Sequence, residues 1–172
     1  VDPRAAAMAA AIAAHYPGSA RAVLFYGSCL RETQLDGLML DFYLIVSDYK
    51  AAYDKAWLAT ANRLIPPNVF PFAHQGLSAK YAVLSEADFA RLCGEGADNV
   101  SVWARFAQPS RLVWAADEAA EQDAVDAVAQ AARDPVAHVQ RIVQVRLGVA
   151  VVGGGLAAFQ CQVAEGVGGV RS

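Results

Sequence analysis

Short apolar runs alternate with helix-like stretches along the chain, and this alternation predicts a mixed sheet flanked by helices. Five runs have the length and composition of strands: 22–26, 38–46, 69–72, 79–84 and 111–114. Four stretches have the composition or spacing of helices: 5–15, 48–64, 85–93 and 117–133. Residues 100–106 fit either a helix or a strand. The expected fold class is α/β in the broad sense, of the α+β kind.

Two local signals refine this pattern. His74-Gln75-Gly76 lies between two predicted strands and indicates a hairpin. The stretch 48–64 is amphipathic, and Pro66-Pro67-Asn68 ends it. The apolar positions of this helix are Ala52, Trp57, Ala61 and Leu64.

Composition narrows the classes of function. A net charge of −3 argues against nonspecific nucleic-acid binding, which rests on clustered Lys and Arg, but it leaves room for a local basic patch that binds phosphate. The three cysteines are scattered and odd in number, so they predict neither a disulfide framework nor a zinc site. A reducing, cytoplasmic setting is the simplest expectation.

The sequence predicts no membrane span. No stretch reaches the ~18 strongly apolar residues that a transmembrane helix requires. The early segment AAAMAAAIAA lacks the basic leader of a signal peptide. Any membrane contact is therefore expected to be peripheral.

Gly27-Ser28 and Asp41 form the strongest chemical signal in the chain. Gly27 and Ser28 end a strand, where a tight turn without a bulky side chain lets backbone N–H groups approach a triphosphate. Asp41 lies inside the next apolar strand, where a carboxylate is costly unless a partner or a divalent metal satisfies it. The pattern favours a phosphate-and-metal site. The alternative is that Asp41 caps a turn or binds Arg31.

Four segments extend this signal, in the order Tyr26-Gly27-Ser28, Met39-Leu40-Asp41-Phe42, Lys80-Tyr81-Ala82-Val83-Leu84-Ser85 and Ala104-Arg105-Phe106-Ala107-Gln108-Pro109. Together they resemble the mitochondrial-type phosphatidate cytidylyltransferases, the translocator-assembly-and-maintenance family, and their bacterial relatives. This family belongs to the polymerase-β-like nucleotidyltransferase superfamily. The superfamily usually carries Asp-x-Asp, whereas Tyr43 stands at the second position here, which suits this single-Asp branch. The resemblance covers residues about 22–114.

The resemblance implies a polymerase-β-like nucleotidyltransferase fold and a specific reaction. In that reaction CMP passes from CTP to phosphatidic acid, which gives CDP-diacylglycerol and pyrophosphate with Mg²⁺ as the cofactor. The implied partners are CTP and phosphatidic acid in a membrane surface, without nucleic acid. The implied location is cytoplasmic and peripheral on the inner face of the membrane. Oligomeric state is left open.

The matched positions receive roles from the resemblance. Tyr26, Gly27 and Ser28 would bind the nucleotide, the last two through its β- and γ-phosphates. Asp41 would bind Mg²⁺ and act in catalysis with Lys80, whose ammonium would reach a triphosphate or a lipid phosphate. Arg105 would clamp the lipid phosphate or the triphosphate.

Alternatives stay open at several of these positions. Lys80 could extend to solvent from a sheet edge, and Arg105 could pair with Asp98 or Glu95. Glu32 and Asp36 are spare acids in the connecting loop, either exposed to solvent or supplying a second metal ligand.

The C-terminal part departs from the family. We divide the chain into a nucleotidyltransferase domain at 1–116 and a helical C-terminal segment at 117–172. The family ends in a basic segment, whereas the tail after Leu147 is rich in Gly, Ala and Val and nearly uncharged. Two further hypotheses therefore stand beside the lipid cytidylyltransferase: a soluble nucleotidyltransferase with another acceptor, and a catalytically impaired nucleotide-binding or assembly module.

Overall fold

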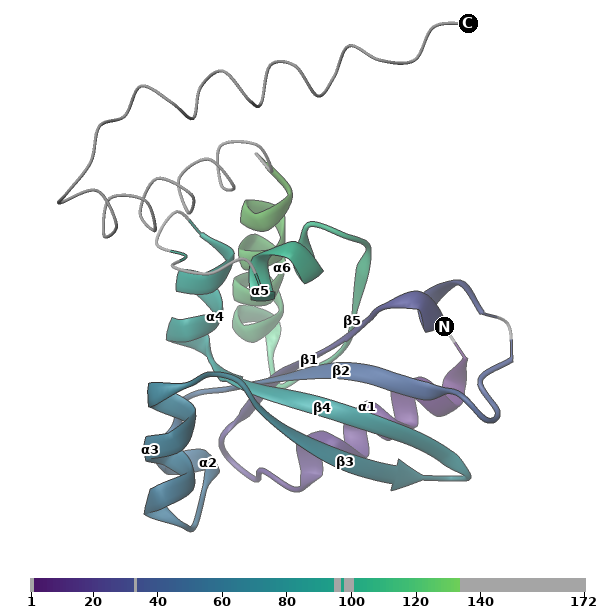
Figure 1. The fold of residues 1–172 in the computed structure, drawn as a ribbon, viewed down its shortest axis with the longest axis horizontal. Coiled ribbons are helices and arrows are strands. Elements are labelled where there is room, and N and C mark those ends of the chain that lie inside the picture. The colour runs from purple at the N-terminus through teal and green to yellow at the C-terminus, as the bar shows by residue number, and fades with distance from the viewer. Residues whose placement is uncertain (1, 33, 95–96, 98–100, 134–172) are drawn as a thin grey trace, which may run out of the picture.

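A five-stranded mixed sheet with helices on both faces forms the body of the protein (Figure 1). The structure is a computed structural model that describes residues 2–32, 34–94, 97 and 101–133. Its strands are β1 (Ala20–Tyr26), β2 (Met39–Val46), β3 (Asn68–His74), β4 (Leu77–Ser85) and β5 (Ser110–Ala115). They lie in the order β3-β4-β2-β1-β5, and only the β2–β4 pair among them is parallel. The predicted α+β class, a mixed sheet flanked by helices, is confirmed.

Helices cover the two faces of this sheet. They are α1 (Pro3–Ala14), α2 (Tyr49–Ala52), α3 (Ala56–Leu64), α4 (Glu86–Cys93), α5 (Ser101–Phe106) and α6 (Glu118–Arg133), with a 3₁₀ turn, η1 (Ser28–Arg31), after β1. The ambiguous stretch 100–106 is thus helical in its described part. Strand alternation divides the core: Leu40, Phe42 and Leu44 pack on the side of α1, while Tyr43 and Ile45 pack under α4, α5 and α6. By the same alternation Asp41 faces the side of α4, α5 and α6.

The hairpin and the start of α4 follow the local signals in the sequence. β3 and β4 pair antiparallel from Asn68 to His74, and the two turn residues Gln75 and Gly76 have φ of 49° and 76°. Positive φ at both central residues is the geometry that suits a two-residue hairpin. At the next turn the Ser85 hydroxyl accepts a hydrogen bond from the Asp88 N–H at 3.2 Å, which caps α4.

The prediction of one helix over 48–64 is wrong, and so is its apolar face. The chain breaks at Tyr53, which is extended, and its hydroxyl donates to Asn62 Oδ1 at 2.7 Å. Asn62, fully buried, turns inward together with Ala59. Trp57 and Leu64, which belong to the predicted apolar face, are instead 64% and 74% exposed. The buried Asn62 amide forms hydrogen bonds with Tyr53, Val83 and Asn68. Because a buried amide needs such partners, Asn62 faces the core and the apolar face predicted for α3 faces outward.

The last described helix, α6, belongs to the same core as the sheet. Its alanines Ala120, Ala124, Ala127 and Ala131 are buried in the cluster that also holds residues of α4 and α5. The division of the chain at residue 116 stays a prediction. The predicted Gly/Ala/Val-rich tail lies outside the described residues. Within the described part of the chain, no helix is both long and apolar enough to cross a bilayer.

Candidate active site

Strand register places three of the predicted site residues in one row across the sheet. Tyr26 of β1 pairs with Asp41 of β2, and Asp41 pairs in turn with Lys80 of β4. Directly paired residues on neighbouring strands point to the same face, so the three side chains lie next to one another. Gly27 and Ser28 follow at once, where β1 passes into η1. The sequence prediction that Gly27-Ser28 and Asp41 lie side by side agrees with this geometry.

Asp41 is the focus of this row. The distance from its Oδ1 to the Lys80 ammonium is 3.3 Å, and the two side chains are 24% and 53% exposed. Oδ1 itself is buried and receives no hydrogen bond within the described part of the chain. The ammonium is therefore close enough for an ion pair but is not aligned as a hydrogen-bond donor. The alternative pairing with Arg31 is wrong, since the cation beside Asp41 is Lys80.

Lys80 does not lie at the sheet edge, because β3 flanks β4 on the outer side. Its neighbour on that strand is Pro71. The alternative that Lys80 merely extends to solvent from an edge strand is therefore wrong, although its ammonium remains partly exposed.

Gly27 makes room for the carboxylate. Its φ is +93°, and a Cβ built at this position would lie 3.3 Å from Asp41 Oδ2. A side chain here would be strained by the backbone and would also press on the carboxylate. Gly27 therefore serves both the turn into η1 and the position of Asp41.

A comparison of Gly27→Ala with Gly37→Ala is expected to separate these two roles. Gly37 is a matched control, because its φ is +79° but no atom lies within 4 Å of an added Cβ. Both Gly27→Ala and Gly37→Ala should lose about 1 kcal/mol of unfolding free energy from backbone strain. Only Gly27→Ala should also weaken nucleotide binding. Urea unfolding and calorimetric titration with CTP measure the two effects, and equal CTP affinity in both variants would contradict the role given to Gly27.

A cavity of about 260 Å³ opens beside Lys80 on the side of α5. Its lining residues are Tyr26, Tyr43, Pro67, Val69, Lys80, Ala82, Ser101 and Arg105. Arg105 is exposed, and its Nη1 donates to the Ser101 carbonyl at 2.6 Å. The predicted lysine and arginine thus lie at one cavity. Asp98 and Glu95, the alternative partners of Arg105, lie outside the described residues.

The tyrosines of this cavity are neutral hydrogen-bonding groups near pH 7. Burial raises the pKa of Tyr26 to about 12, with the nearby Tyr43 and Asp41 adding to the rise and Arg105 opposing it. Burial also raises the pKa of Tyr43. Both phenols therefore keep their protons and cannot serve as bases at neutral pH.

A second cavity, of about 480 Å³, lies at Gly27 and Ser28. It is lined by Gly27, Ser28, Leu30, Arg31, Glu32, Gln108, Pro109, Ser110 and Arg111. Sequence reasoning missed Arg31 and Arg111 as members of this site. Arg31 could have been found from its place in the same short turn as Ser28. Arg111 comes from β5, and its pairing with Phe25 of β1 brings it here, which no local signal announces.

The two spare acids of the connecting loop separate. Glu32 lines the cavity at Ser28. Asp36 instead accepts hydrogen bonds from the Arg4 guanidinium at 2.8 and 3.1 Å, on the exposed side of the N-terminus of α1. Glu32 therefore remains a candidate second carboxylate, whereas Asp36 is bound to another partner.

The single carboxylate of Asp41 suits Mg²⁺, which needs few protein ligands, better than it suits a metal that is enclosed by protein side chains alone. The described residues contain no group of three His, Cys, Asp or Glu side chains that could enclose a metal. Mg²⁺ commonly takes one or two carboxylates and fills its other positions with substrate phosphates and water. Oδ1 of Asp41 receives no hydrogen bond among the described residues, and Oδ2 faces Gly27, which lines the second cavity, so this carboxylate fits that requirement.

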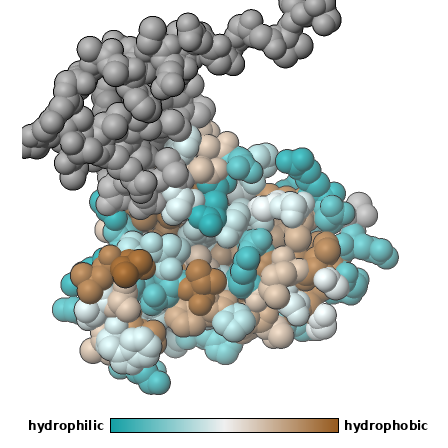
Figure 2. All heavy atoms as spheres, in the orientation of Figure 1, coloured by the Kyte–Doolittle hydropathy of each residue, from teal (hydrophilic) through white to brown (hydrophobic). Residues whose placement is uncertain are grey.

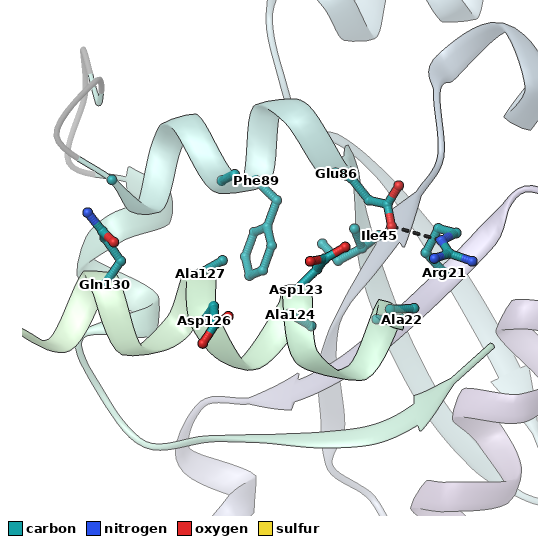
Figure 3. A pocket seen from close by; sticks show the side chains of 13 residues that line it. Arg21, Ala22, Ile45, Glu86, Phe89, Asp123, Ala124, Asp126, Ala127 and Gln130 are labelled. Atoms are coloured by element: carbon teal, nitrogen blue, oxygen red, sulfur yellow. Dashed lines mark hydrogen bonds and ion pairs between the residues drawn. The ribbon is translucent and has the colours of Figure 1, made fainter. Parts of the chain in front are cut away.

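A further cavity lies apart from these residues, between α4 and α6 (Figure 3). It has a volume of about 450 Å³ and an apolar floor that includes Ile45 and Phe89. Arg21 is the basic residue among its described lining, and it is held by Glu86 at 2.8 Å and by Asp117 at 2.6 Å. Because the guanidinium of Arg21 is bound to two carboxylates, this cavity does not offer the positive charge that a phosphate needs.

Comparison with known proteins leaves the family open. No family model matches the chain, and no curated protein matches it. A solved structure of a nucleotidyltransferase-like protein from Exiguobacterium sibiricum 255-15 is similar, with 10% sequence identity and a TM-score of 0.45. The match covers 72% of this chain and 38% of that one, so the chain spans well under half the length of this neighbour. A likeness this distant assigns neither a family nor an activity.

Proposed function

We propose that this protein is a nucleotidyltransferase that transfers CMP from CTP to phosphatidic acid, giving CDP-diacylglycerol and pyrophosphate, with Mg²⁺ as cofactor. The observation that carries the proposal is the environment of Asp41. One carboxylate oxygen is buried without a hydrogen bond, the ammonium of Lys80 is 3.3 Å away, and the other oxygen faces Gly27. Among the described residues this oxygen has the partly exposed ammonium of Lys80 as its partner and no hydrogen bond, which leaves the carboxylate able to bind a divalent cation. The choice of CTP and phosphatidic acid rests on the sequence resemblance.

The two cavities suggest separate places for donor and acceptor. Adjacent residues divide them, since Tyr26 lines one and Gly27 the other. The triphosphate is assigned to the cavity at Ser28, where the turn backbone, Arg31 and Arg111 offer donors and positive charge. The phosphate of the acceptor is assigned to the cavity with Lys80 and Arg105. In the strand register Asp41 lies between Tyr26 and Lys80 of the acceptor cavity, and its Oδ2 faces Gly27, which lines the triphosphate cavity.

The chemistry needs little from the protein beyond charge and position. Mg²⁺ held by Asp41 would neutralise charge on the α-phosphate and on the pyrophosphate that leaves. Lys80, whose half-exposed side chain can turn away from Asp41, would then pair with a phosphate oxygen. An acceptor phosphate oxygen forms the new bond to the α-phosphorus, and the bond from that phosphorus to the β-phosphate bridging oxygen breaks.

The lining of the acceptor cavity favours an anionic acceptor. Among its described residues two are cationic and none is acidic. A phosphate monoester is mostly a dianion near pH 7, because its second pKa is about 6, so it needs no general base. A neutral hydroxyl acceptor would first have to lose a proton, and the described lining of this cavity holds no carboxylate or histidine to take it. We place the enzyme in the cytoplasm, peripheral on the inner face of the membrane.

An impaired nucleotide-binding module is the second candidate, and one observation favours it. Tyr43 occupies the position of the usual second acid, and its side chain is 1% exposed and packs against Phe106 with ring centroids 5.0 Å apart. It lines the acceptor cavity as a phenol and supplies no carboxylate to a metal. Metal binding therefore depends on Asp41, with Glu32, which lines the cavity at Ser28, as the candidate second carboxylate.

Labelled CTP tests the two candidates directly. The full chain is incubated with CTP, Mg²⁺ and phosphatidic acid, and lipid and pyrophosphate products are measured. CDP-diacylglycerol is expected, with Arg105→Gln raising the KM for phosphatidic acid about tenfold or more while CTP affinity stays constant. CTP binding without product would favour the impaired module. Product with a hydroxyl acceptor such as diacylglycerol, but not with phosphatidic acid, would overturn the acceptor assignment.

A further inference from the structure

Exposed apolar side chains gather where α3 passes into β3. Leu64 and Ile65 are 74% and 80% exposed, and Trp57 and Val69 are 64% and 57% exposed. We call these four residues the apolar edge. Figure 2 shows apolar surface on the side of the molecule where α3 lies in Figure 1. Large aliphatic and aromatic groups at such exposure form a candidate interaction surface when they cluster.

The apolar edge continues into the acceptor cavity. Val69 belongs to both, and Pro67, two residues earlier, also lines the cavity with Lys80 and Arg105. β3 is the outer strand, and its residues Val69 and Pro71 pair with Ala82 and Lys80 of β4. A molecule that touched the apolar edge would therefore lie at the mouth of a cavity with two cations.

Three basic residues and two acids, Asp48 and Asp54, lie in the α2–α3 region beside the apolar edge, although the whole chain carries a net charge of −3. Lys50, Lys55 and Arg63 of the α2–α3 region are exposed, and none forms an ion pair within the described part of the chain. Lys50 and Arg63 line a hollow next to Leu64 that holds one acid, Asp54. Apolar side chains flanked by unpaired cations match a surface that is apolar inside and anionic outside.

We propose that the apolar edge docks onto an anionic phospholipid bilayer, with Leu64 and Ile65 entering the interface and Lys50, Lys55 and Arg63 contacting headgroups. This places the acceptor cavity at the bilayer surface, so that a lipid phosphate reaches Lys80 and Arg105 while its acyl chains stay in the membrane. The inference rests on the proposed function only for the identity of the lipid that enters the cavity. The docking itself follows from the exposed side chains and the charges around them.

Vesicle sedimentation with the full chain tests the docking. The Leu64→Ser/Ile65→Ser double variant is compared with the parent on phosphatidylcholine vesicles with and without phosphatidic acid. Val125→Ser is the matched control, since Val125 is an exposed aliphatic residue, 47% exposed, on α6. Partition of the double variant onto anionic vesicles should fall at least about tenfold, because two large side chains no longer enter the interface. The control should bind as the parent does.

A charge variant gives an independent readout. Lys55→Gln/Arg63→Gln should weaken binding to anionic vesicles by about fivefold for each charge removed and make it less sensitive to salt. Vesicle binding of both double variants equal to that of the parent would overturn the docking surface. The docking surface would also be overturned if the variants changed self-association, measured by light scattering, and left vesicle binding unchanged. The apolar edge would then contact a second copy of the chain.

Soluble substrate separates this inference from the proposed function. CMP transfer to a short-chain, water-soluble phosphatidate should proceed equally in the parent and in Leu64→Ser/Ile65→Ser. If the parent transfers nothing while the double variant still loses vesicle binding, the docking stands and the proposed function fails. If transfer to the soluble substrate falls in the double variant as far as vesicle binding does, the edge acts within the site rather than in docking.

Discussion

Replacing Asp41 by asparagine is expected to lower kcat/KM for nucleotidyl transfer by about 10³-fold or more while leaving the fold intact. Asparagine keeps the shape of the side chain next to Gly27 but removes the negative charge that would bind Mg²⁺. Stability should change little, because the Asp41–Lys80 pair is partly exposed and such pairs contribute weakly. The measurement is CDP-diacylglycerol formation at saturating Mg²⁺, together with the thermal midpoint of unfolding.

Asp36→Asn is the control for this variant. Asp36 lies in the loop before β2 and pairs with Arg4, 2.8 Å away, rather than with the site. The Asp36→Asn variant should therefore retain the activity of the parent. Unchanged product formation by Asp41→Asn would remove Asp41 from the mechanism, and a large loss in Asp36→Asn would show that the metal ligands lie elsewhere in the loop.

Replacing Asn62 by leucine is expected to cost about 3 kcal/mol or more of unfolding free energy, although leucine is apolar and the site is fully buried. The Asn62 amide donates to the Val83 carbonyl at 3.0 Å and accepts from the Tyr53 hydroxyl at 2.7 Å and from the Asn68 N–H at 3.2 Å. Leucine would remove these bonds from the buried Tyr53 hydroxyl and Val83 carbonyl and from the part-buried Asn68 N–H. Urea unfolding of the full chain measures the change.

Thr60→Ala provides the comparison on the same helix. Thr60 is exposed, and its hydroxyl donates to the Ala56 carbonyl one turn earlier. Its removal should shift the unfolding free energy by less than about 0.5 kcal/mol. An Asn62→Leu protein as stable as the parent would show that the buried amide does not orient α3.

The strands that carry the site could be predicted because their signals are local. β2 is a long apolar run with one acid, and β1 ends at Gly27-Ser28. A carboxylate among apolar residues and a glycine at a strand end are visible without any knowledge of neighbours. The hairpin at Gln75-Gly76 and the Ser85 cap are local signals of the same kind.

The errors arose where a distant contact outweighed the local pattern. Helical propensity over 48–64 is continuous, yet Tyr53 leaves the helix to reach Asn62, and Asn62 reaches β4. Hydrophobic periodicity therefore assigned Trp57 and Leu64 to the core, whereas the structure exposes them. Arg111 was missed for a related reason, because only the pairing of β5 with β1 brings it to Ser28.

By itself the sequence determined the fold class and the strands of the site, since their signals are local. It also predicted that Gly27-Ser28 and Asp41 lie near each other, because the two strands that carry them follow one another in the chain. Tertiary structure alone decided that Lys80 is the cation beside Asp41, through the parallel register of β2 and β4. It also decided which face of α3 is exposed. Parallel register and helix orientation depend on contacts between segments far apart in the chain, and no local pattern encodes those contacts.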